Sequence, residues 1–164
     1  MVQVTLLGGL RAEARGRVLP PPAHPQGAAL LAWLALHPGE HPRGPLAALL
    51  FPGVSQADAR ASLRSAAWAV RRMLGPDERE VLDGRETIGL RCTTDLQEFE
   101  RLVAAGDPAS ALALCRGALL DGLGDHDWVL AARAEHEQRV RDARARRRRG
   151  EEGPPSSSPS CSRH

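Results

Sequence analysis

The sequence predicts an α+β protein in which an N-terminal winged helix-turn-helix is followed by an incomplete all-α, tetratricopeptide-like domain. Three observations lead to this prediction: short β-rich runs before residue 20, a helix with arginines along one face, and an Asp-Gly dipeptide between two extended runs. The length of 164 residues is enough for one domain or two small ones. We expect a winged-helix domain over residues 1–93, a partial helical domain over residues 94–149 and a disordered tail over residues 150–164.

The N-terminal segment is predicted to form three short strands and then two helices. Val2–Leu7 is a β-rich run that stops at two glycines, and Leu10–Ala14 and Arg17–Leu19 complete a small antiparallel meander. Pro25–His37 is a helix that is apolar on nearly every side, so we expect it to be buried. Pro45–Phe51 is a short second helix with its leucines facing inward.

The third helix, Ala57–Leu74, has clear start and stop signals. Ser55 and Asp58 form a capping pattern at its start, and Gly75-Pro76 ends it. At about 100° per residue, the helix divides into an apolar side and a polar side. The polar side is expected to carry Arg60, Ala61, Arg64, Ser65, Trp68, Arg71 and Arg72.

This polar side holds four arginines and no carboxylate, whereas a solvated helix face normally mixes both signs of charge. Arginines without acidic partners repel one another unless a polyanion binds. The major groove of B-DNA admits one α-helix, and the guanidinium fork matches guanine edges and phosphate oxygens. All 22 basic residues of the chain are arginine, so a basic surface helix in an arginine-rich chain is the alternative interpretation.

A β-hairpin is predicted directly after the third helix. Arg79–Leu82 and Arg85–Leu90 are extended runs, and the Asp83-Gly84 dipeptide between them is a strong hairpin signal. Three helices followed by such a hairpin make a winged helix, with Arg85 at the tip of the wing. The negative potential of the minor groove favours a guanidinium group there. The alternative for Arg85 is an ordinary solvated turn residue.

Three further helices are predicted in the second half of the chain. Thr94–Ala105, Pro108–Leu120 and Trp128–Arg144 have amphipathic patterns and are separated by glycine-containing turns. Successive antiparallel helices indicate a tetratricopeptide-like layer, which the chain leaves incomplete. The run Arg144–Arg149 and the Ser/Pro-rich residues after it break the helical pattern, as a truncated or frameshifted end would.

Charge is distributed unevenly along the chain, although the net charge is only +2. Residues 1–93 carry a net charge of +3, residues 94–143 carry −5 and residues 144–164 carry +4. A basic first part fits a polyanionic partner.

The three cysteines form no CxxC pair or disulfide framework, and no signal peptide or membrane-spanning apolar run is present. We therefore expect a cytoplasmic protein without a membrane partner.

No group of residues indicates an enzyme, a metal site or a cofactor. His37 and His41 have a metal-like spacing but are expected on a turn without a third ligand. His126 is flanked by aspartates at the start of a helix, where Asp is expected as a cap. The Gly-Leu-Gly sequence before it lacks the remainder of a phosphate loop. Trp33 and Trp128 are expected in the core.

The order of several segments resembles that of the SARP-type bacterial transcriptional activators. These segments are LLGGLRAE, ALLAWLALHPGE, PLAALLFPG, ARASLRSAAWAVRRMLG, VLDGRETIGL, TDLQEFERLVAAGD and ALALCRGALLDGL. The family pairs an OmpR-like winged helix with a bacterial transcriptional activator domain built of tetratricopeptide-like helices. The resemblance spans residues 2–145, which makes the chain similar to a C-terminally truncated member.

The resemblance implies a set of DNA contacts and partners. In the family, the third helix enters the major groove and the wing touches the minor groove. The protein binds direct repeats near a promoter in double-stranded DNA and helps to recruit RNA polymerase. By position, the recognition helix would contribute Arg60, Arg64, Ser65, Trp68, Arg71 and Arg72, and the wing would contribute Arg85.

Two hypotheses follow for the function. The first is a sequence-specific DNA-binding transcriptional regulator, with Arg64 and Trp68 in the major groove. In this hypothesis the phosphates are bound by Arg60, Arg71 and Arg72, and the minor groove by Arg85. The second is a truncated protein-interaction module with weak or lost DNA binding, which forms a homodimer through an exposed apolar stripe of the helical domain. The stripe consists of Leu112, Leu119, Val129 and Val140.

Overall fold

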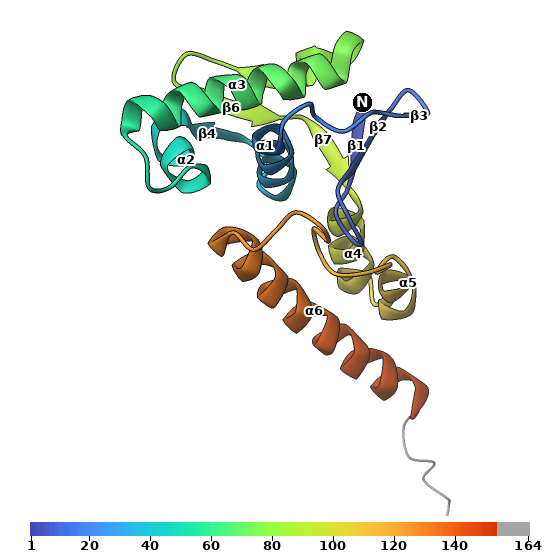
Figure 1. The fold of residues 1–164 in the computed structure, drawn as a ribbon. Helices are drawn as coiled ribbons and strands as arrows, with labels where there is room; N and C mark the ends of the chain where they lie inside the picture. The colour runs from blue at the N-terminus through green and yellow to red at the C-terminus, as the bar shows by residue number, and fades with distance from the viewer. Residues whose placement is uncertain (154–164) are drawn as a thin grey trace, which may run out of the picture.

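The computed structural model describes residues 1–153 and has an α+β fold (Figure 1). The first sheet contains the predicted meander: β1 (Val2–Thr5), β2 (Arg11–Ala14) and β3 (Arg17–Val18) pair antiparallel in that order. A fourth strand, β7 (Cys92–Thr94), pairs parallel with β1 and gives the order β3-β2-β1-β7. The sequence did not indicate β7, because three residues carry too little alternation to mark a strand.

Three helices follow the meander and pack together. α1 (Pro25–Leu36), α2 (Arg43–Leu50) and α3 (Gln56–Leu74) agree with the predicted helices within two residues at each end. Both α1 and α2 pack against α3. Gly27 allows α1 to approach α3 closely, because a Cβ atom at this position would lie 3.0 Å from the Cβ atom of Ala69.

The predicted hairpin is present and belongs to a second sheet. β5 (Val81–Asp83) and β6 (Thr87–Leu90) pair antiparallel, and the Gly84 N–H donates to the Thr87 carbonyl oxygen at 3.0 Å. β4 (Glu40–Pro42) pairs with the other edge of β6, which gives the order β4-β6-β5. β4 occupies part of a segment that was expected to be a turn. It ties the hairpin to the start of α2.

The second half of the described chain is helical. α4 (Asp95–Ala104) begins with a capping box, in which Thr94 and Gln97 each accept the other's backbone N–H. α5 (Pro108–Ala113) is a short helix. α6 (Asp127–Glu151) is 25 residues long and continues through the arginine run that was expected to break it.

The predicted helix over Pro108–Leu120 is wrong beyond its sixth residue. The chain turns back there toward the end of β1. The Leu120 N–H donates to the Leu6 carbonyl oxygen at 2.8 Å, and Leu7 and Leu119 form an antiparallel bridge. The apolar residues of this segment are buried by pairing with a distant part of the chain, which gives no local helix or strand signal.

The apolar stripe that was expected to be exposed on the helical domain faces inward. Leu119 and Val129 are buried, and Leu112 and Val140 are half-buried against the same core. The stripe therefore offers no free surface to a second copy of the chain. Trp33 and Trp128, which were expected in the core, are half-buried at its edge.

Side-chain hydrogen bonds join α4 and α6 to the strand-like pairing beside β1. The Asp95 carboxylate accepts the backbone N–H groups of Leu6 at 2.8 Å and Leu7 at 3.0 Å. The Arg133 guanidinium donates to the carbonyl oxygens of Leu119 at 2.9 Å and Leu120 at 2.7 Å. One hydrophobic core includes residues from β1 and from the helices α4, α5 and α6. The two halves of the chain are therefore packed as one body.

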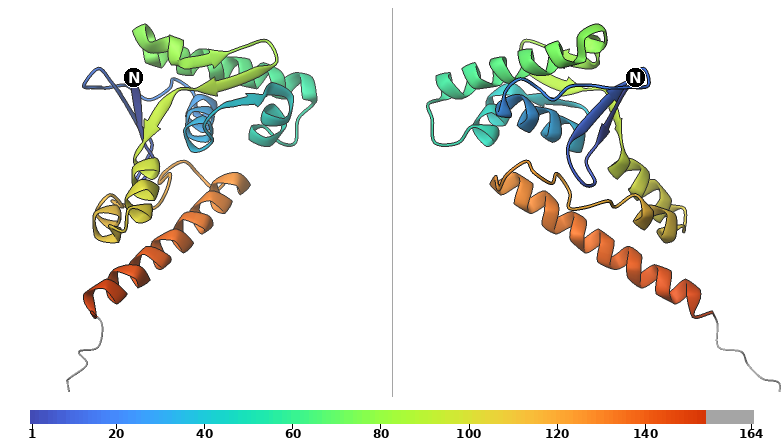
Figure 2. Two further views of the ribbon diagram at one scale, coloured as in Figure 1. Left: turned by 180° about the vertical axis from the view of Figure 1, so that it is seen from behind. Right: turned by 45° about the vertical axis from the view of Figure 1, so that its right-hand side comes forward.

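The long helix α6 determines the outline of the molecule. Figures 1 and 2 show it passing α4 and α5, with its C-terminal end at the opposite end of the molecule from α3. The tail predicted from residue 150 begins within α6, and residues 154–164 lie outside the described residues. None of the helices in residues 1–153 has the length and apolar character needed to cross a membrane.

Candidate nucleic-acid interface

α3 separates its buried and exposed residues with helical periodicity. Ser55 caps the helix by accepting the Asp58 N–H at 3.1 Å, and Gly75 ends it with a positive φ of 54°. The buried side includes Leu63, Ala66 and Val70. All six residues assigned to the recognition helix are exposed: Arg60, Arg64, Ser65, Trp68, Arg71 and Arg72.

A groove of about 620 Å³ lies between α3, the start of α2 and the β5–β6 loop. We call it the α3 groove. It brings together five of the seven sequence-predicted site residues: Arg60, Arg64, Trp68, Arg71 and Arg85. Asp83 and Glu86 also line it, so the groove is mixed in charge. Ser65 and Arg72 do not line it.

Four of the predicted arginines have no acidic partner in the part of the chain that the structure describes. Within residues 1–153, no carboxylate oxygen lies within 4.0 Å of Arg60, Arg64, Arg72 or Arg85. These guanidinium groups are exposed to solvent. Their positive charge is therefore available to an anion.

The expectation of an acid-free face is wrong for Arg71. Its guanidinium lies 3.3 Å from a Glu78 oxygen and 3.4 Å from an Asp83 oxygen. Glu78 belongs to the 3-10 helix η1 (Gly75–Glu80), and Asp83 ends β5. Both acids follow α3 in sequence and fold back beside it, so the periodicity of the helix alone could not reveal them.

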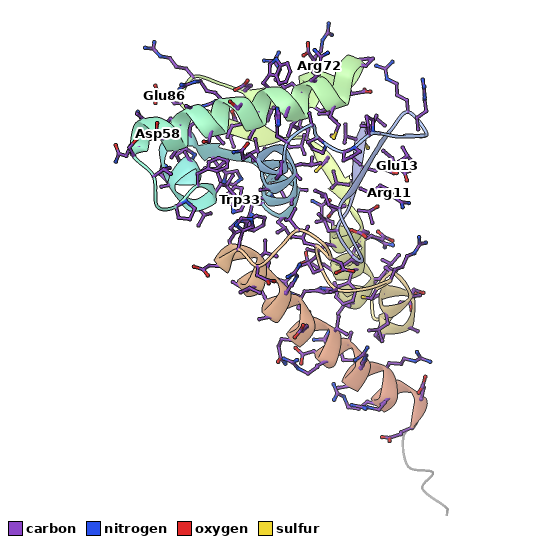
Figure 3. All side chains as sticks on the ribbon, in the orientation of Figure 1. Arg11, Glu13, Trp33, Asp58, Arg72 and Glu86 are labelled. Atoms are coloured by element: carbon purple, nitrogen blue, oxygen red, sulfur yellow. The ribbon has the colours of Figure 1, made fainter. Side chains whose placement is uncertain are left out.

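Trp68 is 55% exposed, which is unusual for an indole. The guanidinium carbon of Arg72 lies 5.3 Å from its ring centroid, within the range of a cation–π contact. Arg72 thus contacts Trp68, which lines the α3 groove, but does not line the groove itself. In Figure 3, Arg72 and Glu86 lie toward different ends of the exposed side of α3.

Arg43 lines the α3 groove although the sequence did not single it out. It is the first residue of α2. The predicted helix began at Pro45, so nothing in the sequence indicated that Arg43 stands at a helix start, where the helix dipole disfavours a cation. Its guanidinium donates to the Asp83 carboxylate at 2.5 Å and to the Gly84 carbonyl oxygen at 3.2 Å. Its backbone N–H donates to the Glu86 carbonyl oxygen at 3.0 Å.

The histidines with metal-like spacing each bond through a ring nitrogen to the carbonyl oxygen of the residue four positions earlier. His37 Nδ1 lies 2.9 Å from the Trp33 carbonyl oxygen, and His41 Nε2 lies 2.7 Å from the His37 carbonyl oxygen. The His37 ring also stacks on the Trp33 indole, with centroids 4.1 Å apart. Among the described residues, no group of three or more His, Cys, Asp and Glu side chains could hold a metal ion.

Comparison with known proteins gives a likeness in fold. No protein-family model matches the sequence, and no curated protein matches it. The structure is similar to that of Mycobacterium tuberculosis EmbR, which was solved in complex with a low-affinity phosphopeptide, with a TM-score of 0.73 and 25% sequence identity. The match covers 87% of this chain and 43% of the EmbR chain, so the chain spans less than half of EmbR. EmbR is a winged-helix transcriptional regulator and not an enzyme, and the likeness is to its N-terminal region.

Proposed function

We propose that this chain is a sequence-specific DNA-binding transcriptional regulator. The observation that carries the proposal is that Arg60, Arg64 and Arg85 line one groove and have no carboxylate within 4.0 Å in residues 1–153. The likeness to EmbR, a regulator with a winged-helix DNA-binding domain, supports it.

In this proposal α2 and α3 are the helix-turn-helix, and the β5–β6 hairpin is the wing. α3 enters the major groove, whose width admits one helix. Arg64 and Trp68 are four residues apart and share the exposed face, so they contact base edges. Arg60 and Arg72 bind phosphates, and Arg85 enters the minor groove. Arg71 contributes a phosphate contact only by exchanging its carboxylate partners for DNA.

The finer organisation follows the same proposal. Residues 1–93 are the winged-helix domain, and α4–α6 are part of a tetratricopeptide-like activator domain. The target is a direct repeat near a promoter, and RNA polymerase is the further partner.

The test begins with selection of duplexes from a randomised DNA pool by the wild-type chain. We expect an enriched sequence that contains a direct repeat. Arg64→Glu should weaken binding to this duplex by far more than the roughly 5- to 150-fold expected for Arg64→Ala, which loses one base contact of about 1–3 kcal/mol. Fluorescence anisotropy titrations measure both affinities.

Arg146→Glu is the matched control for Arg64→Glu. It makes the same change in net charge on an exposed arginine of α6, at the opposite end of the molecule from α3. We expect a small loss of affinity that disappears as salt is raised. Equal losses for the two variants, or unchanged affinity of Arg64→Glu, would remove α3 from the interface.

The interaction-module hypothesis is less well supported, because the stripe on which it depends is buried or half-buried within the chain. Light scattering tests it independently. A stable oligomer that is indifferent to DNA and to salt would favour this hypothesis over the regulator.

A further inference from the structure

Asp83 links two arginines that come from different helices. One carboxylate oxygen lies 2.5 Å from the Arg43 guanidinium at the start of α2, and the other lies 3.4 Å from the Arg71 guanidinium near the end of α3. The side chains of Arg43 and Asp83 are only 17% and 26% exposed. We call these three residues the Asp83 brace.

The Asp83 brace also holds the hairpin loop. Arg43 donates from its side chain to the Gly84 carbonyl oxygen and from its backbone to the Glu86 carbonyl oxygen. Residues on both sides of Arg85 are therefore tied to the first residue of α2. Since Arg71 ties Asp83 to α3, the loop has a fixed position relative to both helices that line the α3 groove.

We propose that Asp83 is a positioning residue for DNA recognition. It fixes Arg85 relative to Arg64, and it keeps Arg43 and Arg71 in intramolecular pairs that withhold them from phosphates. This inference rests on the proposed DNA-binding function. The chemical consequence is selectivity: the carboxylate reduces sequence-independent attraction to the DNA backbone and preserves the geometry on which base and groove contacts depend.

The charge balance explains why the carboxylate matters. Asp83 is shared between two guanidinium groups in a groove that also holds Arg60 and Arg64. If its charge is removed, the net charge of the groove rises by one, and Arg71 keeps only Glu78 as an acidic partner in residues 1–153. Each additional phosphate contact raises the salt dependence of binding by about 0.9 in log–log slope. The same change loosens the loop, because Arg43 loses its charged acceptor.

Asp83→Asn is the test variant, and Glu78→Gln is the matched control. Glu78 lies 3.3 Å from the Arg71 guanidinium, like Asp83, but it is half exposed and belongs to η1 rather than to the hairpin. Both changes remove one negative charge beside Arg71 with little change in shape. Only Asp83→Asn also weakens the contact with Arg43 that holds the loop.

Two measurements on the full chain decide the question. Anisotropy titrations over a range of salt use the duplex enriched by the wild type and a scrambled duplex of the same length. Amide hydrogen exchange of residues 83–87 is followed without DNA. We expect Asp83→Asn to bind the scrambled duplex roughly three- to tenfold more tightly, with a salt slope steeper by about one. We also expect it to discriminate less between the two duplexes and to exchange faster in the loop.

Glu78→Gln should raise affinity for both duplexes alike and leave the loop exchange unchanged. Asp83→Glu, which keeps the carboxylate, should recover the weak binding to the scrambled duplex. Arg43→Met has a long side chain without a donor for Asp83 and Gly84, so it should also speed loop exchange. This variant provides the test if Asp83→Asn does not fold.

Identical behaviour of Asp83→Asn and Glu78→Gln in discrimination and in exchange would overturn the inference while leaving DNA binding intact. Failure of the proposed function has a different signature. The wild type would then enrich no sequence and show no salt-dependent binding, while loop exchange would still report whether the Asp83 brace holds the hairpin.

Discussion

Arginines occur throughout the chain, but their contacts differ between the helices α4–α6 and the surface around α3. In α4–α6, Arg101 bonds to the glutamate three residues before it, and Arg139 bonds to glutamates on α4 and α6. Arg133 bonds to the backbone carbonyl oxygens of Leu119 and Leu120 and to Asp125. These side chains hold helices and loops together.

Around α3, Arg43 and Arg71 are paired with acids, but four other arginines have no such partners among the described residues. Arg60, Arg64, Arg72 and Arg85 are exposed and lie more than 4.0 Å from any carboxylate within residues 1–153. In a chain without lysine, the number of arginines alone does not identify an anion-binding surface. Arg144, Arg146, Arg148 and Arg149 of α6 also lack a carboxylate within 4.0 Å in residues 1–153, so what marks the candidate surface is that three unpaired arginines line one groove.

The largest effect is expected at Asp95, which joins the helical part to the β1 end of the α3 part. Asp95→Ala tests whether the two regions fold together. The change leaves the backbone N–H groups of Leu6 and Leu7 without their acceptor. We expect a loss of about 2–4 kcal/mol in the free energy of unfolding, from two unsatisfied donors. Urea unfolding followed by circular dichroism and by tryptophan fluorescence should show one coincident transition.

Asp95→Asn serves as the control for that prediction, since its amide oxygen can still accept one hydrogen bond. It should lose less stability than Asp95→Ala. Two separate transitions in Asp95→Ala, with the α3 part unaffected, would mean that the halves fold independently.

Arg133 and Arg64 are expected to differ in function, the first stabilising the fold and the second binding DNA. Arg133→Ala should cost about 2–3 kcal/mol in unfolding free energy, because the carbonyl groups of Leu119 and Leu120 lose a charged donor. Its affinity for DNA should stay the same. Arg64→Ala should change stability by less than about 0.5 kcal/mol, as expected for an exposed side chain, and should weaken DNA binding. Urea titration and anisotropy on the same samples measure both effects, and the reverse pattern would contradict the assignment.

A smaller effect is expected at an exposed ion pair of the helical part. Arg139 joins Glu100 on α4 to Glu135 on α6 at the surface. Arg139→Ala should cost about 0.5–1 kcal/mol, and the loss should shrink in 1 M salt because the charges are screened. A salt-independent loss would show that the side chain acts by packing instead.

The smallest effect at neutral pH concerns His136, which is 5% exposed on α6. Burial lowers the pKa of His136 below its ordinary value of 6.5, and the neighbouring Arg139 lowers it further. As pH falls below 6.5, the unfolded chain binds a proton more readily than the folded chain, so stability should fall until the lower pKa of the folded state is passed.

His136→Leu should leave stability at pH 7 close to wild type and should reduce its decline in acid. Urea midpoints between pH 7 and pH 5 measure this dependence. His24→Leu, at an exposed position before α1, is the control for loss of a histidine. An unchanged acid dependence in His136→Leu would assign the decline to other groups.

The sequence predicted those elements whose signals are local. Ser55 and Gly75 mark the ends of α3 through bonds and backbone angles within the helix and its next residues. The Asp83-Gly84 dipeptide marks the hairpin in the same way. The exposed face of α3 followed from periodicity, so the positions of its arginines could be predicted without coordinates.

Elements that depend on distant partners could not be predicted. β4 and β7 are three residues long and are strands only because they pair with β6 and β1. The chain after α5 was expected to be helical because alanine and leucine favour helices, but pairing with Leu6 and Leu7 prevails there. The role of Arg43 and the partners of Arg71 were missed for the same reason, since Asp83 reaches both only after the hairpin has folded.

The pairing of Leu6 and Leu7 with Leu119 and Leu120 has a practical consequence for making shorter versions of the protein. A fragment cut at residue 93 would lose this pairing and the Asp95 carboxylate together. Leu6 and Leu7, now at most 1% exposed, would become an open apolar edge that invites aggregation. A minimal fragment for crystallisation with DNA should therefore extend at least to Leu120.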